Sequence, residues 1–123
     1  MARLHYILLF AIMAIFIDTA SAFSGDATFY SPGLGACGKS SSNSDLIFAL
    51  PAVMFDPSPG GNPNKNKNCG RKVKVTRGRK SVIVRCVDRC TGCKFGDIDL
   101  SPAAFRKLGA FSEGRVNVKW TFV

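Results

Sequence analysis

Five cysteines constrain this 123-residue chain more than any other feature of its sequence: Cys37, Cys69, Cys86, Cys90 and Cys93. In an extracellular chain of this size, such a set indicates a disulfide framework that supplements a small hydrophobic core. The spacing of Cys90 and Cys93 also occurs in zinc sites, but the partner Cys-x-x-Cys pair is missing. We therefore expect disulfides and no metal. Because five is odd, one thiol stays free or pairs with another chain, and Cys86 is our candidate because it lies within an apolar run.

The first 22 residues are typical of a secretory signal peptide. Arg3 provides the positive start, residues 6–17 are uninterruptedly apolar, and residues 20–22 (ASA) have the small-x-small pattern of a cleavage site. A membrane-spanning helix needs about 20 apolar residues, more than this run contains. We predict a signal peptide at 1–22 and one secreted, extracellular domain at 23–123, with no membrane attachment after cleavage. The single histidine, His5, leaves with the signal peptide, which excludes Ser-His-Asp and Cys-His catalysis.

Short segments of alternating polarity dominate the remaining sequence. Apolar residues alternate with polar ones on both sides of Arg77-Gly78, which predicts a hairpin, and again in residues 116–122, which predicts a strand with Trp120 in the core. Ser101-Pro102 is typical of a helix start and predicts a helix at 103–108. Many short strands with one or two short helices indicate an all-β barrel or sandwich.

Positive charge gathers in residues 65–80, which carry eight Lys or Arg and no acidic residue. The whole chain has a net charge of +9. This stretch is either a solvated strand face that favours solubility or a surface that attracts acidic wall polymers by long-range electrostatics. We do not expect nucleic acid as a partner, because no segment is typical of a base-reading or base-stacking module.

Six segments, taken in order, resemble the double-psi β-barrel family of rare lipoprotein A-like proteins, first domains of expansins, loosenins, barwin-type proteins and certain endoglucanases. The segments are GDATFY at 25–30, GACG at 35–38, NCG at 68–70, VDRCTGC at 87–93, DIDLSPAAF at 97–105 and GRVNVKW at 114–120. They span nearly all of residues 23–123. The resemblance implies a six-stranded double-psi β-barrel with one or two short helices, stabilised by disulfides.

The resemblance also implies a polysaccharide groove. In expansin-type domains the positions matching Thr28, Asp88 and Asp99 line that groove, and the Asp99 position corresponds to the general acid of the endoglucanases. Tyr30 follows in the same strand and offers a ring that can stack on a sugar. The competing hypothesis for Asp88 and Asp99 is structural: hydrogen bonds to backbone amides and capping of the helix after Ser101.

Hydrolysis of a glycosidic bond normally uses two carboxylates. The endoglucanases place their base just after the first-strand motif, where this chain has Tyr30-Ser31-Pro32. We therefore expect a non-hydrolytic, expansin-like protein, with a single-acid lytic transglycosylase reaction left open. The expected partner is cell-wall polysaccharide: cellulose, chitin, peptidoglycan or an acidic glycan. We expect a monomer without a cofactor. The alternative function is inhibition of papain-like cysteine proteases, which one branch of the small single-domain relatives performs.

Two disulfide pairings are our hypothesis, Cys37 with Cys69 and Cys90 with Cys93. The first would tie the loop after the first strand to the strand that follows the long polar loop. The second would stiffen the turn between Asp88 and Asp99. A bridge from Cys86 to Cys90 would contradict this hypothesis.

Overall fold

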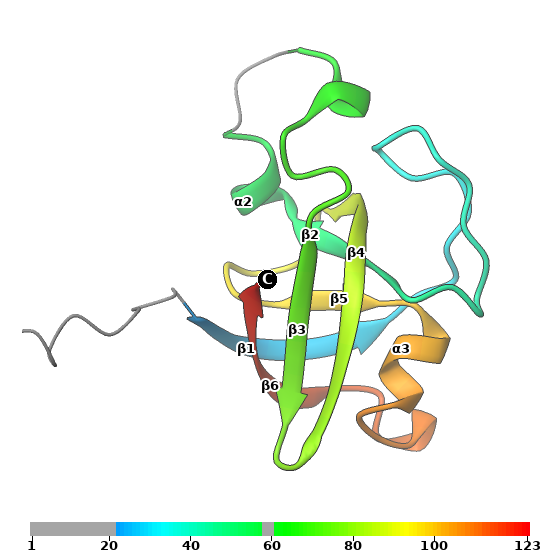
Figure 1. Cartoon of the computed structure of the whole chain (residues 1–123), viewed down its shortest axis with the longest axis vertical. Helices are drawn as coiled ribbons and strands as arrows, with labels where there is room; N and C mark the ends of the chain where they lie inside the picture. The colour runs from blue at the N-terminus through cyan, green and yellow to red at the C-terminus, as the bar shows by residue number, and fades with distance from the viewer. Residues whose placement is uncertain (1–21, 58–60) are drawn as a thin grey trace, which may run out of the picture.

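The computed structural model describes residues 22–57 and 61–123 (Figure 1). Within them, six strands close into a barrel in the order β1-β5-β2-β4-β3-β6. The strands are β1 (Ala22–Phe29), β2 (Ile47–Pro51), β3 (Lys72–Arg77), β4 (Lys80–Cys90), β5 (Ile98–Leu100) and β6 (Val116–Phe122). The helical segments are α2 (Ala52–Phe55), η1 (Pro63–Lys65), α3 (Pro102–Arg106) and η2 (Phe111–Glu113). The expected six-stranded barrel is confirmed. The predicted signal peptide lies outside the described residues, except for Ala22, which begins β1.

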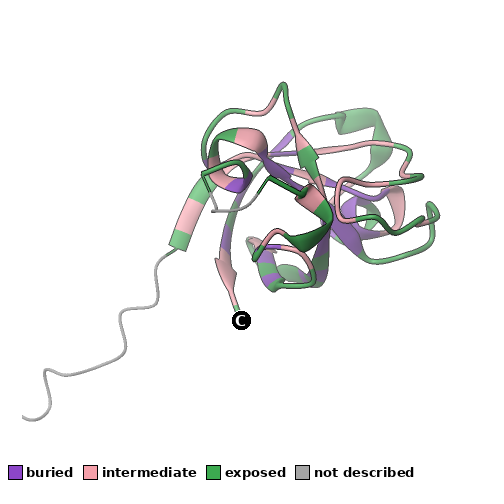
Figure 2. Ribbon diagram, turned by 90° about the horizontal axis from the view of Figure 1, so that it is seen from above, coloured by how far each residue is buried: buried purple, intermediate pink, exposed green. Residues whose placement is uncertain are grey.

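The barrel mixes parallel and antiparallel pairs. β1 pairs with β5 and β2 pairs with β4 in parallel, while the other four pairs are antiparallel. The β3–β4 hairpin, which the alternating valines predict, places Val73 opposite Val84 and Val75 opposite Val82. Since all of these valines are buried, the inner side of the hairpin belongs to the core. In Figure 2 buried residues alternate along the ribbon with intermediate and exposed ones.

Trp120 anchors the core at the end of the barrel where β6 passes the loop between β4 and β5. Its side chain is 1% exposed, and its indole Nε1 donates a hydrogen bond of 2.8 Å to the carbonyl oxygen of Gly96. Gly25 of β1 lies close to the same carbonyl oxygen, and a Cβ added to this glycine would be 2.3 Å from it. Glycine is therefore required in β1, and this close approach fixes β1 beside the segment that leads into β5.

A β-bulge changes the direction of side chains halfway along β4. Val82, Val84 and Cys86 face the core, so simple alternation would also turn Asp88 inward. The register with β2 shifts, however, between Phe48, which pairs with Cys86, and Ala49, which pairs with Asp88. One extra residue in β4 reverses the pattern, as bulges generally do. Asp88 therefore leaves the core and faces the outer surface.

Helix α3 begins as its sequence predicts and ends earlier. The Ser101 side chain accepts a hydrogen bond from the backbone N–H of Ala104 at 3.3 Å, and Pro102 occupies the first turn. The helix ends at Arg106, because the N–H of Lys107 already bonds to Ala104 and Phe105 in a tighter turn. None of the helices in the described ranges has the length and apolar composition needed to cross a membrane.

Two disulfides are present, and both have the pairing that we expect from the sequence. Cys37 bonds to Cys69 and Cys90 bonds to Cys93. Cys86 remains a buried free thiol, so the alternative bridge to Cys90 does not form. Burial raises the pKa of the Cys86 thiol to about 12, which keeps the thiol protonated and unreactive at neutral pH. Two disulfides in a chain of this size fit an extracellular protein.

Candidate functional site

Four residues lie in one row across four neighbouring strands, on the outer side of the barrel. Thr28 of β1 pairs with Asp99 of β5, Asp99 pairs with Ala49 of β2, and Ala49 pairs with Asp88 of β4. Directly opposed residues of neighbouring strands share one face of a sheet. The row therefore brings together Thr28, Asp88 and Asp99, the three residues that the resemblance assigns to a groove. Their role in binding stays a prediction.

Ala49 is the member of this row that sequence reasoning missed. It lies between the two aspartates in the strand register and is only 2% exposed. Its neighbours Phe48 and Leu50 both join the core cluster, whereas Ala49 does not. A lone small residue inside an apolar strand was the available signal, but its neighbours across the sheet are visible only in the folded chain.

The carboxyl group of Asp99 is half-buried and accepts one hydrogen bond. The Thr28 hydroxyl donates to its Oδ1 at 2.9 Å, and no other donor reaches this carboxyl within the described ranges. Burial raises the pKa of Asp99 above its ordinary value, and the negative charge of Asp88 adds to this effect. The Thr28 hydrogen bond and the distant Arg115 charge act in the opposite direction. Asp99 therefore keeps its proton to a higher pH than an exposed aspartate does, as a proton donor requires.

Asp88 has a different environment from Asp99. Its Oδ1 accepts backbone hydrogen bonds of 2.8 Å from both Ala36 and Arg89. The carbonyl of Val87 accepts a further bond of 3.1 Å from Cys37, so Asp88 and its neighbour together hold the loop that carries the Cys37–Cys69 bridge. The structural hypothesis thus describes Asp88 well. Neither aspartate caps helix α3, because Ser101 does so.

Tyr30 lies beside the row, with its hydroxyl directed inward. The ring is half-buried, and the hydroxyl oxygen is buried without a hydrogen-bond partner among the described residues. Burial raises the pKa of Tyr30, and the nearby charges of Asp88 and Asp99 raise it further. The expected stacking platform is therefore only partly exposed. A buried hydroxyl without a partner costs about 1–3 kcal/mol of stability.

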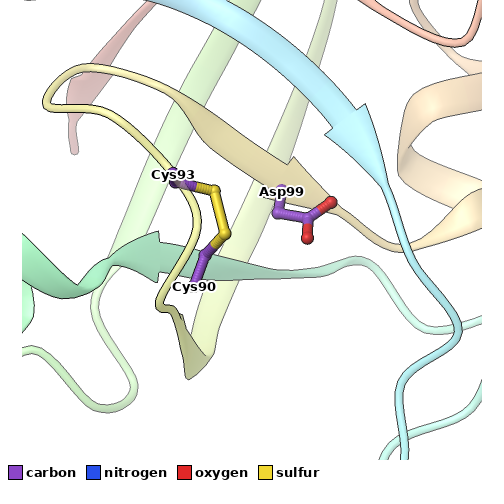
Figure 3. Close-up of side chains that lie close together, drawn as sticks. All are labelled: Cys90, Cys93 and Asp99. Atoms are coloured by element: carbon purple, nitrogen blue, oxygen red, sulfur yellow. A yellow bond between two sulfur atoms is a disulfide. The ribbon is translucent and has the colours of Figure 1, made fainter.

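The Cys90–Cys93 disulfide forms a wall next to Asp99. One atom from each of Cys90, Cys93 and Asp99 lies within 4.8 Å of the others, and Figure 3 shows the bridge beside the carboxyl. In the disulfide the sulfur atoms are not thiolates, so they are not metal ligands. The bridge instead lies beside Asp99. The sequence predicts a stiffened turn here, but the proximity of the bridge to Asp99 follows only from the structure.

Comparison with known proteins gives matches over most of the chain. A family model described as "Lytic transglycolase" matches residues 22–120. The papain inhibitor of Streptomyces mobaraensis is 37% identical over 112 residues, which cover 87% of this chain and 76% of that protein. The allergen Asp f 7 homolog of Arthroderma benhamiae is 31% identical over 115 residues, covering 81% of this chain. The matched region spans only 38% of the length of that allergen homolog.

Two solved structures share the barrel. The Streptomyces papain inhibitor superposes with a TM-score of 0.77 and 34% identity, covering 84% of this chain and 94% of that one. A mutant expansin of Clavibacter michiganensis, solved in complex with cellohexaose, superposes with a TM-score of 0.70 and 27% identity. That match covers 84% of this chain and 50% of the expansin. Proteins with two different activities therefore share the fold described above.

Proposed function

Since the chain belongs to the rare lipoprotein A-like double-psi β-barrel family, whose model is described as lytic transglycolase, we propose that it is a secreted protein that binds or loosens cell-wall polysaccharide without hydrolysing it. One observation carries this proposal: the row of Thr28, Ala49, Asp88 and Asp99 on the outer surface, in which Asp99 retains a free hydrogen-bonding capacity. The expansin solved with cellohexaose, which has the same barrel, supports a β-linked glucan as one ligand.

The row has the chemistry that a sugar chain requires. The Asp99 carboxyl, when protonated, donates a hydrogen bond to a glycosidic or ring oxygen, and when ionised it accepts bonds from sugar hydroxyls. Thr28 holds this carboxyl in place through its hydroxyl. Together these groups form a shallow polar strip bordered by the Cys90–Cys93 bridge.

We propose that hydrolysis is absent because no second carboxylate of the row is free to act together with Asp99. An acid–base mechanism needs a partner for Asp99 that is free to act as base or nucleophile. Asp88 is the other carboxylate of the row, and its Oδ1 accepts two backbone N–H groups. These bonds hold the carboxylate in a fixed position and occupy its Oδ1. We therefore assign Asp88 to supporting the groove and Asp99 to contacting the polysaccharide.

The experiment that tests this function uses the secreted form, residues 23–123, mixed with insoluble cellulose, chitin, peptidoglycan or pectin-rich wall. We expect a bound fraction on at least one polymer and no release of reducing sugar. The assay measures protein left in solution and sugar released. Release of reducing sugar would contradict the non-hydrolytic proposal, and solubilised peptidoglycan without new reducing ends would indicate a transglycosylase reaction. Failure to bind any of the polymers would contradict the proposed function.

Papain inhibition is the second candidate function. Its support is the 37% identity to the papain inhibitor of Streptomyces mobaraensis and the superposition over 94% of the Streptomyces inhibitor chain. The measurement is residual papain activity against increasing amounts of this protein. Under the polysaccharide function, papain remains active at an equimolar ratio. Stoichiometric inhibition that survives Asp99→Asn would assign the activity to the loops and favour the inhibitor function.

A further inference from the structure

The outer side of β3 and its two neighbours carries a cluster of cations, which we call the lysine face: Lys72, Lys74, Arg85 and Lys119. All four side chains are exposed. In the strand register Lys72 lies opposite Arg85 of β4, and Lys119 of β6 lies opposite Thr76 of β3. The sequence places the first two in one basic stretch, but only the closed barrel adds Lys119 to the same surface.

No acidic side chain balances this cluster within the described residues. The three ion pairs there involve Arg77, Arg89 and Arg115, none of which belongs to the lysine face. β3 and β6 contain no acidic residue, and Asp88, the acidic residue of β4, lies beyond the bulge. Like charges directly opposite each other in a sheet are destabilising. A bound anion between Lys72 and Arg85 would relieve this repulsion.

The lysine face also offers hydrogen-bonding groups for a polymer. Three residues with hydroxyl groups belong to the same surface. In the strand register Thr76 pairs with Ser81 and with Lys119, and Thr121 pairs with Lys74. A hollow of about 350 Å³ continues the face toward the hairpin turn, and its lining includes Thr76, Asn117 and Lys119. Neighbouring strands lie about 4.8 Å apart and alternate residues of one strand about 6.8 Å apart. These spacings place hydroxyl and amide groups between the positive charges.

The composition of this face favours an acidic polysaccharide over other polyanions. Its outward residues include no aromatic ring on which a base would stack, which is the usual feature of single-stranded nucleic-acid sites. Ile83 is the exposed large apolar residue of the face, and one such side chain gives little contact with a lipid surface. Alternating cations and hydroxyl groups match a chain that carries both carboxylates and sugar hydroxyls.

The centre of the lysine face, on β3, and Asp99, on β5, lie on opposite sides of the barrel, while Arg85 and Asp88 share β4. In the closed order, β3 is three strands away from β5 in either direction. In Figure 1 the β3–β4 hairpin crosses in front of β1 and β5. A polymer bound along β3 therefore leaves the surface around Asp99 free.

We propose that the lysine face is a second binding site, which takes a linear acidic polysaccharide with one carboxylate on each sugar, such as polygalacturonate. The choice of a wall polysaccharide rests on the proposed function, whereas the anionic character follows from the face alone. The protein then holds an acidic polymer on one side while the Asp99 row contacts a second polysaccharide on the other. It acts as a bridge between two wall components.

The test measures the affinity of the secreted form for polygalacturonate and for insoluble cellulose in parallel. The variant Lys72→Gln/Lys74→Gln/Lys119→Gln should bind polygalacturonate at least about tenfold more weakly and cellulose unchanged, because three ionic contacts are lost on one face only. A matched control, Lys94→Gln/Arg106→Gln/Lys107→Gln, removes the same charge from exposed positions elsewhere and should retain binding. Equal weakening by both variants would overturn the proposal, since net charge alone would then explain the affinity.

Further binding experiments distinguish a failure of this proposal from a failure of the proposed function. Asp99→Asn should leave polygalacturonate binding unchanged, and loss of that binding would place the acidic polymer in the groove instead. Equal affinity for double-stranded DNA would overturn the preference for an acidic polysaccharide. If no neutral polymer binds while polygalacturonate binds through the lysine face, the groove function fails and this proposal stands. The reverse pattern overturns this proposal alone.

Discussion

Replacing Asp99 with asparagine should weaken binding to neutral wall polysaccharide by about tenfold or more while the barrel stays folded. A hydrogen bond to a charged or proton-donating carboxyl contributes roughly 1.5–3 kcal/mol, and 1.4 kcal/mol corresponds to tenfold in affinity. Asparagine is nearly the same size and still accepts the Thr28 hydrogen bond, so the side chain at position 99 keeps its place in the row. The bound fraction on cellulose across a protein titration provides the measurement. Unchanged affinity in a folded variant would show that Asp99 does not contact the polymer.

The same variant should also change stability with a defined dependence on pH. Because burial raises the pKa of Asp99 above the unfolded value of about 3.8, ionisation costs the folded state more than the unfolded state. The stability associated with the protonated carboxyl is therefore present at about pH 3 and is lost as the pH rises through the raised pKa. Asparagine carries no charge to bury. We expect Asp99→Asn to melt at or above the wild-type temperature at about pH 7 and to match the wild type at about pH 3.

Asp88→Asn is the matched control for this behaviour. Its Oδ1 accepts backbone N–H groups of Ala36 and Arg89, so loss of the negative charge weakens two charge-assisted bonds. This variant should lose stability at about pH 7, opposite in sign to Asp99→Asn. The same sign in both variants would contradict the different roles assigned to the two aspartates.

Removing the Cys37–Cys69 bridge should destabilise the protein by about 4 kcal/mol, whereas removing the Cys90–Cys93 bridge should cost about 2 kcal/mol. The reason is the length of chain that each bridge closes in the unfolded state. The first spans a sequence separation of 32 and the second a separation of 3. Paired serine variants, Cys37→Ser/Cys69→Ser and Cys90→Ser/Cys93→Ser, are matched in chemistry and differ in loop length. Denaturant unfolding of each variant measures the two losses.

The two bridges should also differ in their effect on the groove. Because the Cys90–Cys93 bridge lies beside Asp99, its removal exposes that carboxyl and should weaken polysaccharide binding even in the folded protein. The Cys37–Cys69 bridge acts through stability, so its variant should bind normally under conditions where it remains folded. Normal binding by Cys90→Ser/Cys93→Ser would contradict a role of this bridge in shaping the site.

Local patterns in the sequence were sufficient for much of the barrel. The alternating valines of the hairpin and the alternation around Trp120 identify core faces directly, because a strand turns successive side chains to opposite sides. Ser101 and Pro102 mark the helix start through bonding that involves only the next few residues. The double-psi connections could not be obtained in this way, since they depend on pairs between distant strands. For them the resemblance to known proteins was needed.

The candidate site, like the barrel, was predicted only in part from the sequence. The resemblance selects Thr28, Asp88 and Asp99 and singles out Asp99 as the position of the general acid, but it does not give the surroundings of the two aspartates. Their difference arises from the bulge in β4, which turns Asp88 toward the backbone amides of the Cys37 loop. It arises also from the Cys90–Cys93 bridge and Tyr30, which lie beside Asp99 and Asp88 in space. A bulge is a property of two paired strands, so the alternation of one strand alone does not reveal it.

From sequence alone, this protein is a disulfide-stabilised β-barrel with a basic stretch and a short set of candidate acidic residues. Composition, alternation and cysteine spacing predict the disulfides, the short strands and the basic stretch, because each depends on neighbours along the chain. The closed barrel and the candidate aspartates come from the resemblance to known proteins. Only the tertiary structure decides that Asp99 is the half-buried, proton-retaining member of the row and that Lys119 joins the lysine face on the opposite side. The physical reason is that desolvation and charge repulsion depend on distances between strands that are far apart in sequence.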